Sequence, residues 1–171
     1  MGGKAAMWLA LSHPQLVDGL VVADMAPVRY PSGFETMIDA LRELPLADIS
    51  DRADADRRLA AAIPSPGVRA YLLQNLRRGD DGWRWRFNLA GIADAMPDLL
   101  DFPDPSGRQF SGPALFIYGT ASNYVDAAGL ARIRALFPLA RLRALANAGH
   151  WVYAEQPDAF VSALRTFLTR A

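Results

Sequence analysis

The sequence of 171 residues contains no cysteine, and this absence excludes several kinds of chemistry. A disulfide framework, a thiolate metal site and a thiol nucleophile all require that side chain. Histidine is scarce as well, with His13 and His150 as the two examples, so a usual zinc site is not expected. We therefore expect neither a bound metal ion nor a cofactor. A chain without cysteine fits a reducing compartment, and we expect a cytoplasmic location.

The chain also lacks an excess of either charge. Lys and Arg number 18 together, as do Asp and Glu, so the net charge is zero. Without a basic field, nucleic acid and anionic lipid are not expected partners. The segment GWRWRFNLAGI alternates aromatic and basic residues, a pattern that can bind single-stranded nucleic acid. Asp80 and Asp81 precede it and offset its arginines, so we expect no nucleic-acid partner.

Long apolar runs are missing too. No run approaches the roughly 18 residues that a membrane-spanning helix needs, so no membrane span is expected. The start of the chain, Lys4 followed by AAMWLAL, resembles a signal peptide only weakly. Its apolar part is at the short limit, and no A-x-A cleavage site follows it.

The two ends of the chain carry an alternation of element types. Residues 4–11 have a helical pattern that ends before Pro14, and DGLVVAD follows as a continuously apolar strand. Residues 113–119 predict a second buried strand, residues 126–137 a helix, residues 141–146 a third strand, and residues 155–170 a closing helix. Strands that alternate with helices predict an α/β fold with a parallel sheet of three strands.

The middle of the chain has a different pattern. Residues 30–104 contain the helical patterns FETMIDALREL, ADADRRLAAAI and GVRAYLLQNL, interrupted by proline and glycine turns. We find no convincing buried strand among them. The pattern predicts a helical cap at 30–104, inserted into a core of residues 1–29 and 105–171.

His150 is the first candidate for chemistry. It follows the third strand in NAGHWVYAEQPDAF, on a short loop after Gly149. Loops at the carboxyl ends of parallel strands are where α/β sheets place reacting groups. From its position alone, His150 is equally compatible with a packing role. His13, between a helix end and Pro14, is expected to be a solvent-facing residue at that helix end.

Several segments together resemble a known family. AGHW, followed by an acidic-x-Pro-x-x-Phe helix start, is similar to the histidine loop of α/β-hydrolase enzymes. MGGKAAM resembles the second half of their nucleophile elbow, immediately after the serine. VVADMAPVRY, WRWRFNL and FIYGTASNYV resemble further parts of one branch, the YbfF-type short-acyl esterases, which have small helical caps.

This resemblance implies the carboxyl-terminal part of an α/β-hydrolase sheet and hydrolysis of a small carboxylic ester or thioester. The serine of the Ser-Asp-His triad is then expected just before Met1, whose backbone N–H would be an oxyanion donor. These residues alone are expected to be inactive. LVVAD would also lack one neighbouring strand, which predicts aggregation or oligomers of unknown state. The alternative is a non-catalytic fragment or interaction module.

The acid of the triad needs a separate argument. Its usual place in the family, a G-x-x-D pattern after the strand LFIYG, ends here in Ser122. Asp24 ends the strand LVVAD, which should pair with LFIYG at a spacing of about 4.8 Å. The esterase branch likewise has its acid at the matching Asp, although Asp24 could also be a turn or capping residue. Asp126 is the rival acid but suits a helix N-cap better. Ser122 and Trp151 are expected to contact substrate.

Overall fold

The structure, a computed structural model, describes residues 1–169. It divides into a core unit, Met1–Tyr30 together with the chain from Leu100 onward, and an inserted unit, Pro31–Leu99. The insertion expected from the sequence was longer, at 30–104. At the boundary, Tyr30 N–H donates to Leu100 O at 2.8 Å and Lys4 Nζ donates to Leu100 O and Asp101 O, and all four residues belong to the core unit.

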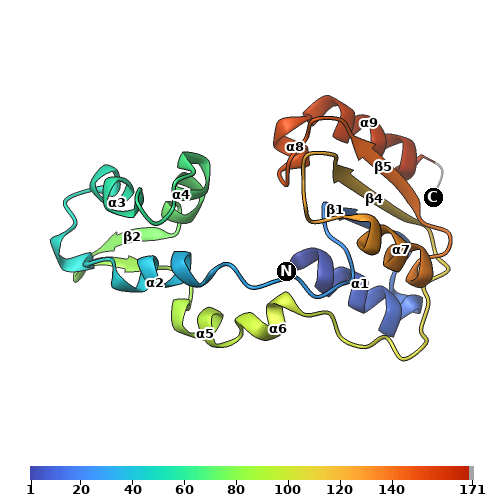
Figure 1. Ribbon diagram of the computed structural model, residues 1–171, viewed down its shortest axis with the longest axis horizontal. Helices are drawn as coiled ribbons and strands as arrows, with labels where there is room; N and C mark the ends of the chain where they lie inside the picture. Colours follow the sequence, from blue (N-terminus) through green and yellow to red (C-terminus); the bar gives the residue numbers. More distant parts are fainter. Residues whose placement is uncertain (170–171) are drawn as a thin grey trace. The chain divides into compact units, whose positions relative to one another are not determined.

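The core unit is built on a parallel sheet of three strands, as predicted. These strands are β1 (Leu20–Ala23), β4 (Ala114–Gly119) and β5 (Arg141–Leu145), in the order β1-β4-β5 (Figure 1). Val22 pairs with Phe116, and Tyr118 pairs with Ala144. The apolar strand β4 therefore lies in the middle of the sheet, where both of its faces are covered.

Helices cover the two faces of this sheet (Figure 1). The elements α1 (Gly2–Ser12) and α7 (Ala127–Leu136) pack on one face, and α8 (Val152–Glu155) and α9 (Pro157–Leu168) pack on the other. Successive residues of β4 point to opposite sides, so Phe116 joins the cluster with α1 and α7 while Ile117 joins the cluster with α8 and α9. A short 3-10 helix, Pro14–Leu16, connects α1 to β1.

The ends of these helices follow from local chemistry. Asp126 caps α7, as predicted, because its side chain accepts a hydrogen bond from Gly129 N–H at 2.7 Å. Pro157 is the first residue of α9, where its fixed backbone angle is favourable and its missing N–H costs nothing. Arg170, the expected end of the closing helix, lies outside the described residues. None of the helices within residues 1–169 has the length and apolar character to cross a membrane.

The inserted unit contains the expected helical segments. They are α2 (Glu35–Glu43), a 3-10 helix (Leu46–Asp48), α3 (Arg52–Leu59), α4 (Pro66–Leu73), α5 (Leu89–Asp94) and α6 (Met96–Leu100), whose last residue belongs to the core unit. The N-caps are Asp51 for α3 and Ser65 for α4. Leu41, Leu59, Leu73 and Leu76 are buried in the apolar core of this unit.

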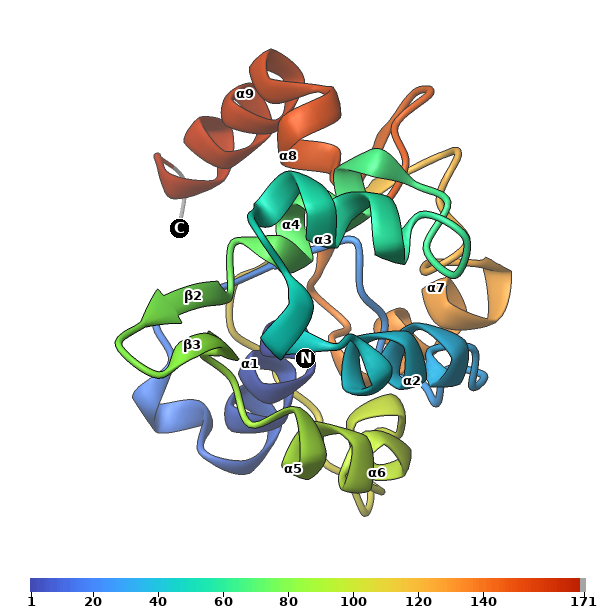
Figure 2. The same ribbon diagram turned by 90° about the vertical axis from the view of Figure 1, so that its left-hand side faces the viewer.

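The inserted unit also contains an antiparallel hairpin, which the sequence did not predict, although its strands are mostly not buried, in line with the finding of no convincing buried strand in residues 30–104. Its strands are β2 (Leu76–Gly79) and β3 (Gly82–Trp85), joined by a turn at Asp80 and Asp81. Gly82 has a φ of +103°, a conformation that only glycine adopts readily. The alternation of Trp83 and Trp85 with Arg84 is therefore a strand pattern of period two. Figures 1 and 2 show α3 and α4 on one side of this hairpin and α2 and α5 on the other.

Candidate active site

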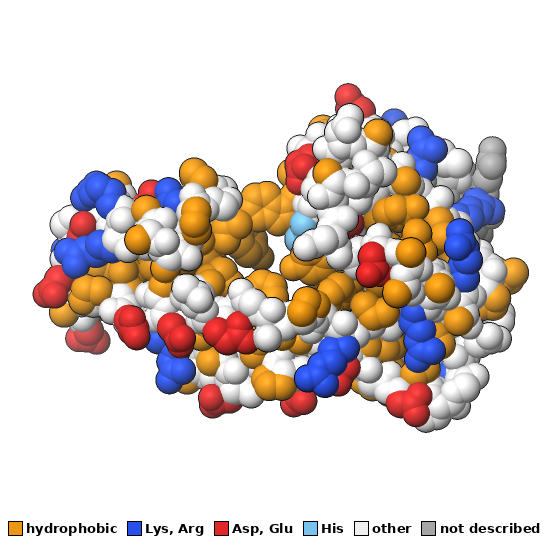
Figure 3. All heavy atoms as spheres, in the orientation of Figure 1, with side chains coloured by type: hydrophobic (Ala, Val, Ile, Leu, Met, Phe, Trp, Pro, Cys, Tyr) orange, Lys and Arg blue, Asp and Glu red, His pale blue; other side chains and the backbone are white. Residues whose placement is uncertain are grey.

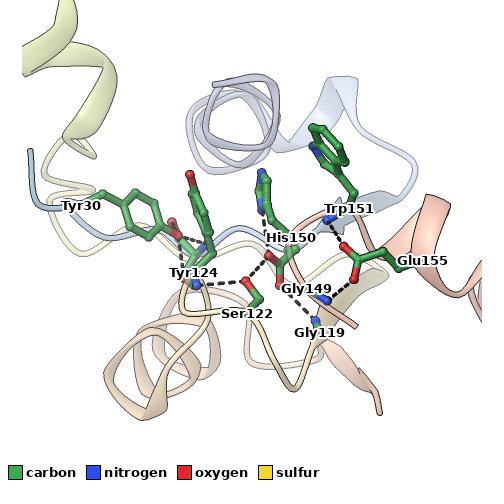
Figure 4. Close-up of polar contacts among 10 residues, drawn as sticks. Tyr30, Gly119, Ser122, Tyr124, Gly149, His150, Trp151 and Glu155 are labelled. Carbon is green, nitrogen blue, oxygen red and sulfur yellow. Dashed lines mark hydrogen bonds and ion pairs between the residues drawn. The ribbon is translucent and has the colours of Figure 1, made fainter. Parts of the chain in front are cut away.

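The candidate site lies at the carboxyl edge of the core sheet. Because the strands are parallel, the segments that follow β1, β4 and β5 all leave the sheet at this edge. Asp24 follows β1 directly, Ser122 and Tyr124 lie in the segment after β4, and His150 lies in the loop after β5. Figure 4 shows the side chains of Ser122, Tyr124 and His150 close together. Asp24 and Ser122 are 98 positions apart in the sequence, because the inserted unit separates β1 from β4.

Asp24 is the centre of the hydrogen-bond network. It is 1% exposed, and its carboxylate accepts three hydrogen bonds. Gly119 N–H donates to Oδ1 at 3.0 Å, Ser122 Oγ–H donates to Oδ2 at 2.5 Å, and Nδ1 of His150 lies 2.8 Å from Oδ2. Its φ of +45° is a left-handed conformation, which Asp adopts more readily than most residues. The buried carboxylate is therefore fully partnered and held in one orientation.

The imidazole of His150 is held by a contact on its edge and another on its face. An ionised carboxylate only accepts hydrogen bonds, so the contact with Asp24 places the proton of a neutral imidazole on Nδ1. Tyr124 stacks on the ring with centroids 3.9 Å apart and an interplanar angle of 20°. The other ring nitrogen points away from Asp24 (Figure 4). The side chain of His150 is 41% exposed. This geometry leaves an accessible basic nitrogen that can take a proton from a reacting group.

The histidine loop is fixed by the backbone around it. The two oxygens of Glu155 accept hydrogen bonds from the N–H groups on either side of His150: Gly149 N–H at 2.7 Å and Trp151 N–H at 3.2 Å. The loop also lies directly against the end of β4, because a Cβ at Gly119 would overlap the carbonyl oxygen of Ala148. Only glycine at position 119 allows this close approach.

A second layer of contacts supports Tyr124. The hydroxyl of Tyr30 donates to Tyr124 O at 2.8 Å and accepts from Ala26 N–H at 2.7 Å. The two tyrosine rings lie 5.1 Å apart between centroids. Burial raises the pKa of Tyr30 to about 12, so the hydroxyl keeps its proton at neutral pH. Burial also raises the pKa of Tyr124 above its ordinary value, with a smaller contribution from the charge of Asp24.

Lys4 completes this layer from α1. Its ammonium donates to Leu100 O at 2.6 Å and Asp101 O at 2.8 Å, and it lies 4.6 Å from the centroid of the Tyr30 ring. Burial lowers its pKa to about 8, and the nearby charge of Asp101 opposes this shift. Lys4 therefore links α1 to Tyr30 and to the segment Leu100–Asp101 within the core unit.

The structure brings the predicted pair together. The contact between Asp24 and His150 was expected from the pairing of their strands, and it is present. Asp126, the rival acid, instead caps α7. Ser122 was expected to line the substrate site, and this role stays a prediction. Its hydroxyl donates to Asp24 and accepts from Tyr124 N–H, so it is bonded to the candidate acid. His13 lies exposed at the end of α1, as expected.

Two predicted site residues have no assigned role in this network. Met1 is 73% exposed at the start of α1, where its carbonyl accepts a hydrogen bond from Ala5 N–H. Trp151 is partly buried at the start of α8 and contacts Glu155 through its backbone. The oxyanion role of Met1 and the substrate role of Trp151 stay predictions. No three His, Asp or Glu side chains within residues 1–169 converge as a metal site would require.

Sequence reasoning missed Tyr124 and Glu155 as members of the site. Tyr124 could have been found from its place after β4, since that segment leaves the sheet at the same edge as His150. Glu155 carried a signal as well, because it stands five residues after His150 and two residues before the proline that begins α9. Neither position shows from the sequence alone that its side chain turns back toward the histidine loop.

Comparisons with known proteins agree with this geometry. Residues 1–163 match the model of the Alpha/beta hydrolase family. The chain is 36% identical over 174 residues to the sn-1-specific diacylglycerol lipase ABHD11 of Mus musculus, covering 98% of this chain and 56% of that protein. It is 34% identical over 169 residues to Esterase YbfF of Escherichia coli (strain K12), covering 98% of this chain and 64% of that protein.

A solved structure is similar over nearly the whole chain. A marine microorganism esterase superposes with a TM-score of 0.90 at 30% identity, covering 96% of this chain and 66% of that one. The chain thus spans 56% and 64% of the lengths of these two curated relatives. With a matching family model, esterase relatives and the expected parallel sheet, the chain belongs to the alpha/beta hydrolase family.

Proposed function

We propose that this chain supplies the acid and the base of a serine esterase that hydrolyses small carboxylic esters or thioesters. The observation that carries the proposal is the 2.8 Å contact between Nδ1 of His150 and Oδ2 of the buried Asp24. In a serine triad the base is a histidine held in this way by a carboxylate, which fixes the tautomer of the imidazole. The esterase relatives support an ester as the substrate.

The nucleophile of the proposed reaction is a serine directly before Met1, as the resemblance of MGGKAAM to a nucleophile elbow implies. The other ring nitrogen of His150, Nε2, takes the proton of that serine as its oxygen attacks the ester carbonyl. The backbone N–H of residue 1 then donates to the oxygen that becomes negatively charged. His150 returns the proton to the leaving alcohol or thiol, which leaves the acyl group on the serine. Water, activated by His150 in turn, releases the carboxylic acid and restores the serine.

The network around the pair has a function in each step. The imidazolium that forms is stabilised by the carboxylate of Asp24 at its edge and by the face of Tyr124. Ser122 and Gly119 hold the carboxylate so that it does not rotate away from the imidazole. Glu155 holds the loop that carries the base. Preorganisation of this kind lowers the cost of charge formation in the transition state.

We propose in addition that the inserted unit is the cap of this esterase and that Trp151 contacts substrate. The small caps of the branch that the sequence resembles support the first point. The position of Trp151 next to the base supports the second. The cytoplasmic location remains an expectation from the absence of cysteine.

The test is hydrolysis of p-nitrophenyl acetate by two proteins, the 171-residue chain and the same chain extended upstream through the serine. The 171 residues alone should give no turnover. The extended chain should turn over, and His150→Ala should reduce its kcat by about 10³-fold or more. Asp126→Asn should leave kcat unchanged. An extended chain without turnover, or with turnover that His150→Ala does not reduce, would favour the non-catalytic alternative.

A further inference from the structure

The inserted unit has an open groove with a strongly basic lining. Its volume is about 820 Å³, and its walls are formed by α3, α4 and the hairpin β2–β3. Arg52, Arg77 and Arg86 line it, with the amide of Asn75 between them in the sequence and the buried Leu73 as an apolar part. The site proposed for ester hydrolysis uses none of these residues. Lys4 is the only lysine of the sequence, so all blue side chains on the inserted unit in Figure 3 are arginines.

The one carboxylate in the lining is already partnered. Asp56 receives two hydrogen bonds from Arg69: Nε donates to Oδ1 at 2.7 Å and Nη2 donates to Oδ2 at 3.2 Å. This partner holds the pKa of Asp56 below its usual range. Arg69 is buried and donates further to Ile63 O and Pro64 O, so the pair is part of the framework. The three arginines of the lining are therefore not neutralised by the acid beside them.

The pairing of the two hairpin strands brings a further arginine next to those of the lining. Arg77 and Arg84 stand directly opposite each other in the β2–β3 register, and both are exposed. Like charges at opposite positions destabilise an antiparallel pair. Arg86 continues the same face, since it is two residues beyond Arg84 and its N–H donates to Asn75 O at 2.9 Å. The opposite face of the hairpin packs on the unit's core through Leu76 and Trp85.

The positive charge of the lining arginines is not balanced by a free carboxylate of the lining, because Asp56 is bonded to Arg69. We propose that the groove binds the phosphate group of a phosphorylated ligand, with Arg77 and Arg86 as its principal donors. The planar guanidinium matches two oxygens of a phosphate at once, and several such groups suit a ligand with more than one negative charge. The guanidinium of Arg52 is held at the groove, because its Nη2 donates to Leu76 O at 2.9 Å. The phosphate can belong to a water-soluble ester or to a lipid headgroup.

The test is titration calorimetry of the full chain with inorganic pyrophosphate at low ionic strength. Arg77→Ser and Arg86→Ser should each weaken binding by about tenfold or more, because each removes a charge-assisted contact. The matched control is Arg132→Ser, which removes an exposed arginine from α7 of the core unit. It should bind as the unchanged chain does. An equal loss in the control, no loss in the groove variants, or no binding by the unchanged chain would overturn the proposal.

A second measurement guards against misfolded variants. Arg77→Ser relieves the repulsion with Arg84, so its melting temperature without ligand should be at least that of the unchanged chain. Pyrophosphate should then raise the melting temperature of the unchanged chain and of Arg132→Ser, but not that of Arg77→Ser. A melting temperature that rises equally in all three proteins would contradict a site at Arg77.

Vesicles distinguish the two sources of phosphate. Phosphatidylcholine vesicles with phosphatidic acid should bind the chain through Arg77 and Arg86 if the ligand is a lipid, and pure phosphatidylcholine vesicles should not. Binding of pyrophosphate without binding of phosphatidic acid vesicles would assign the site to a water-soluble phosphate ester. Absence of pyrophosphate binding overturns the site whatever the vesicles show. The outcome is independent of ester hydrolysis, because Asp24 and His150 belong to the core unit.

Discussion

The imidazole Nδ1 of His150 lies 2.8 Å from the carboxylate Oδ2 of Asp24, although the two residues are 126 positions apart in the chain. The parallel sheet produces this contact. β1 and β5 flank the central strand β4, and the segments that follow them leave the same edge. The inserted unit lengthens the chain between them without altering the pairing of β1 with β4. A contact built in this way depends on strand register and on the conformation of two short segments.

The first prediction concerns the tautomer of His150. In Asp24→Asn, the amide nitrogen would donate to Nδ1, so the proton of the neutral imidazole should move to Nε2. Asn also tolerates the left-handed backbone at this position, so the fold should survive. Long-range 1H–15N spectra of the two imidazoles distinguish the tautomers, with His13 as the internal reference.

The control for this experiment is Asp126→Asn, which removes the charge from the cap of α7. That variant should leave the proton of His150 on Nδ1. If Asp24→Asn also left it there, the carboxylate would not be the group that sets the tautomer. In an active esterase built on this pair, the wrong tautomer should lower kcat by about 10⁴-fold.

The second prediction concerns the close approach at Gly119. A methyl group there would overlap the carbonyl oxygen of Ala148, whose loop leads to His150. Gly119→Ala should lower the free energy of unfolding by about 3 kcal/mol, at the upper end of overpacking costs. Urea unfolding measures this difference.

Gly2→Ala is the matched control, because a Cβ at Gly2 meets no atom within 4 Å. It lies in the first turn of α1 and should be neutral or slightly stabilising. Equal stability of the Gly119→Ala and Gly2→Ala variants would mean that the loop can move away from β4 without cost.

The third prediction concerns the carboxylate that holds the histidine loop. Glu155→Ala removes the acceptor of the N–H groups of Gly149 and Trp151, and these groups should lose protection from hydrogen exchange. The loss of stability should be about 1–2 kcal/mol, since the contacts are near the surface. Glu155→Gln keeps one acceptor oxygen and should lose less.

Asp158→Asn provides the comparison for Glu155. It removes a negative charge from an exposed position in the first turn of α9, three residues away. Exchange at Gly149 should be unchanged in this variant. Unaltered protection of both N–H groups in Glu155→Ala would show that other contacts hold the loop.

The sequence contained enough information for the core sheet and for its central pair. Apolar runs such as VVA and LFIY are typical of strands buried on both faces. The place of Asp24 after the first strand and of His150 after the third predicted their contact. The roles of Ser122 and Tyr124 could not be predicted, because they depend on how the segment after β4 folds back over Asp24. Polar loop contacts of this kind leave no periodic pattern.

The hairpin of the inserted unit was missed for a different reason. Its strands are four residues each, and the arginines on its open face hide the alternation of buried and exposed side chains. The turn signal was present in Asp81 followed by Gly82. The arginines suggested a basic binding segment, whereas the structure pairs the two strands. Trp85 faces inward and donates to Leu41 O at 3.2 Å.

The last prediction concerns Lys4 and has a definite sign. Its pKa is about 8 in the folded chain, whereas an unfolded lysine titrates near 10.4. At a pH between these two pKa values the unfolded state binds more protons than the folded state. The contribution of Lys4 to the free energy of unfolding should therefore rise with pH in this range. Lys4→Met removes this titration while keeping an apolar stem. The stability of the unchanged chain relative to Lys4→Met should therefore increase from about pH 7 to pH 10 in urea unfolding.

The upper limit of this window is set by Tyr30, whose raised pKa of about 12 has the opposite effect. An unfolded tyrosine loses its proton near pH 10, so above that value the folded state binds more protons and stability should fall. Arg132→Met is the control, because it removes an exposed positive charge. The difference in unfolding free energy between the unchanged chain and Arg132→Met should not change with pH across this window. A constant difference between the unchanged chain and Lys4→Met across the window would mean that the ammonium is as well solvated in the folded state as in the unfolded one. In that case the contacts to Leu100 O and Asp101 O would not enclose the ammonium as described.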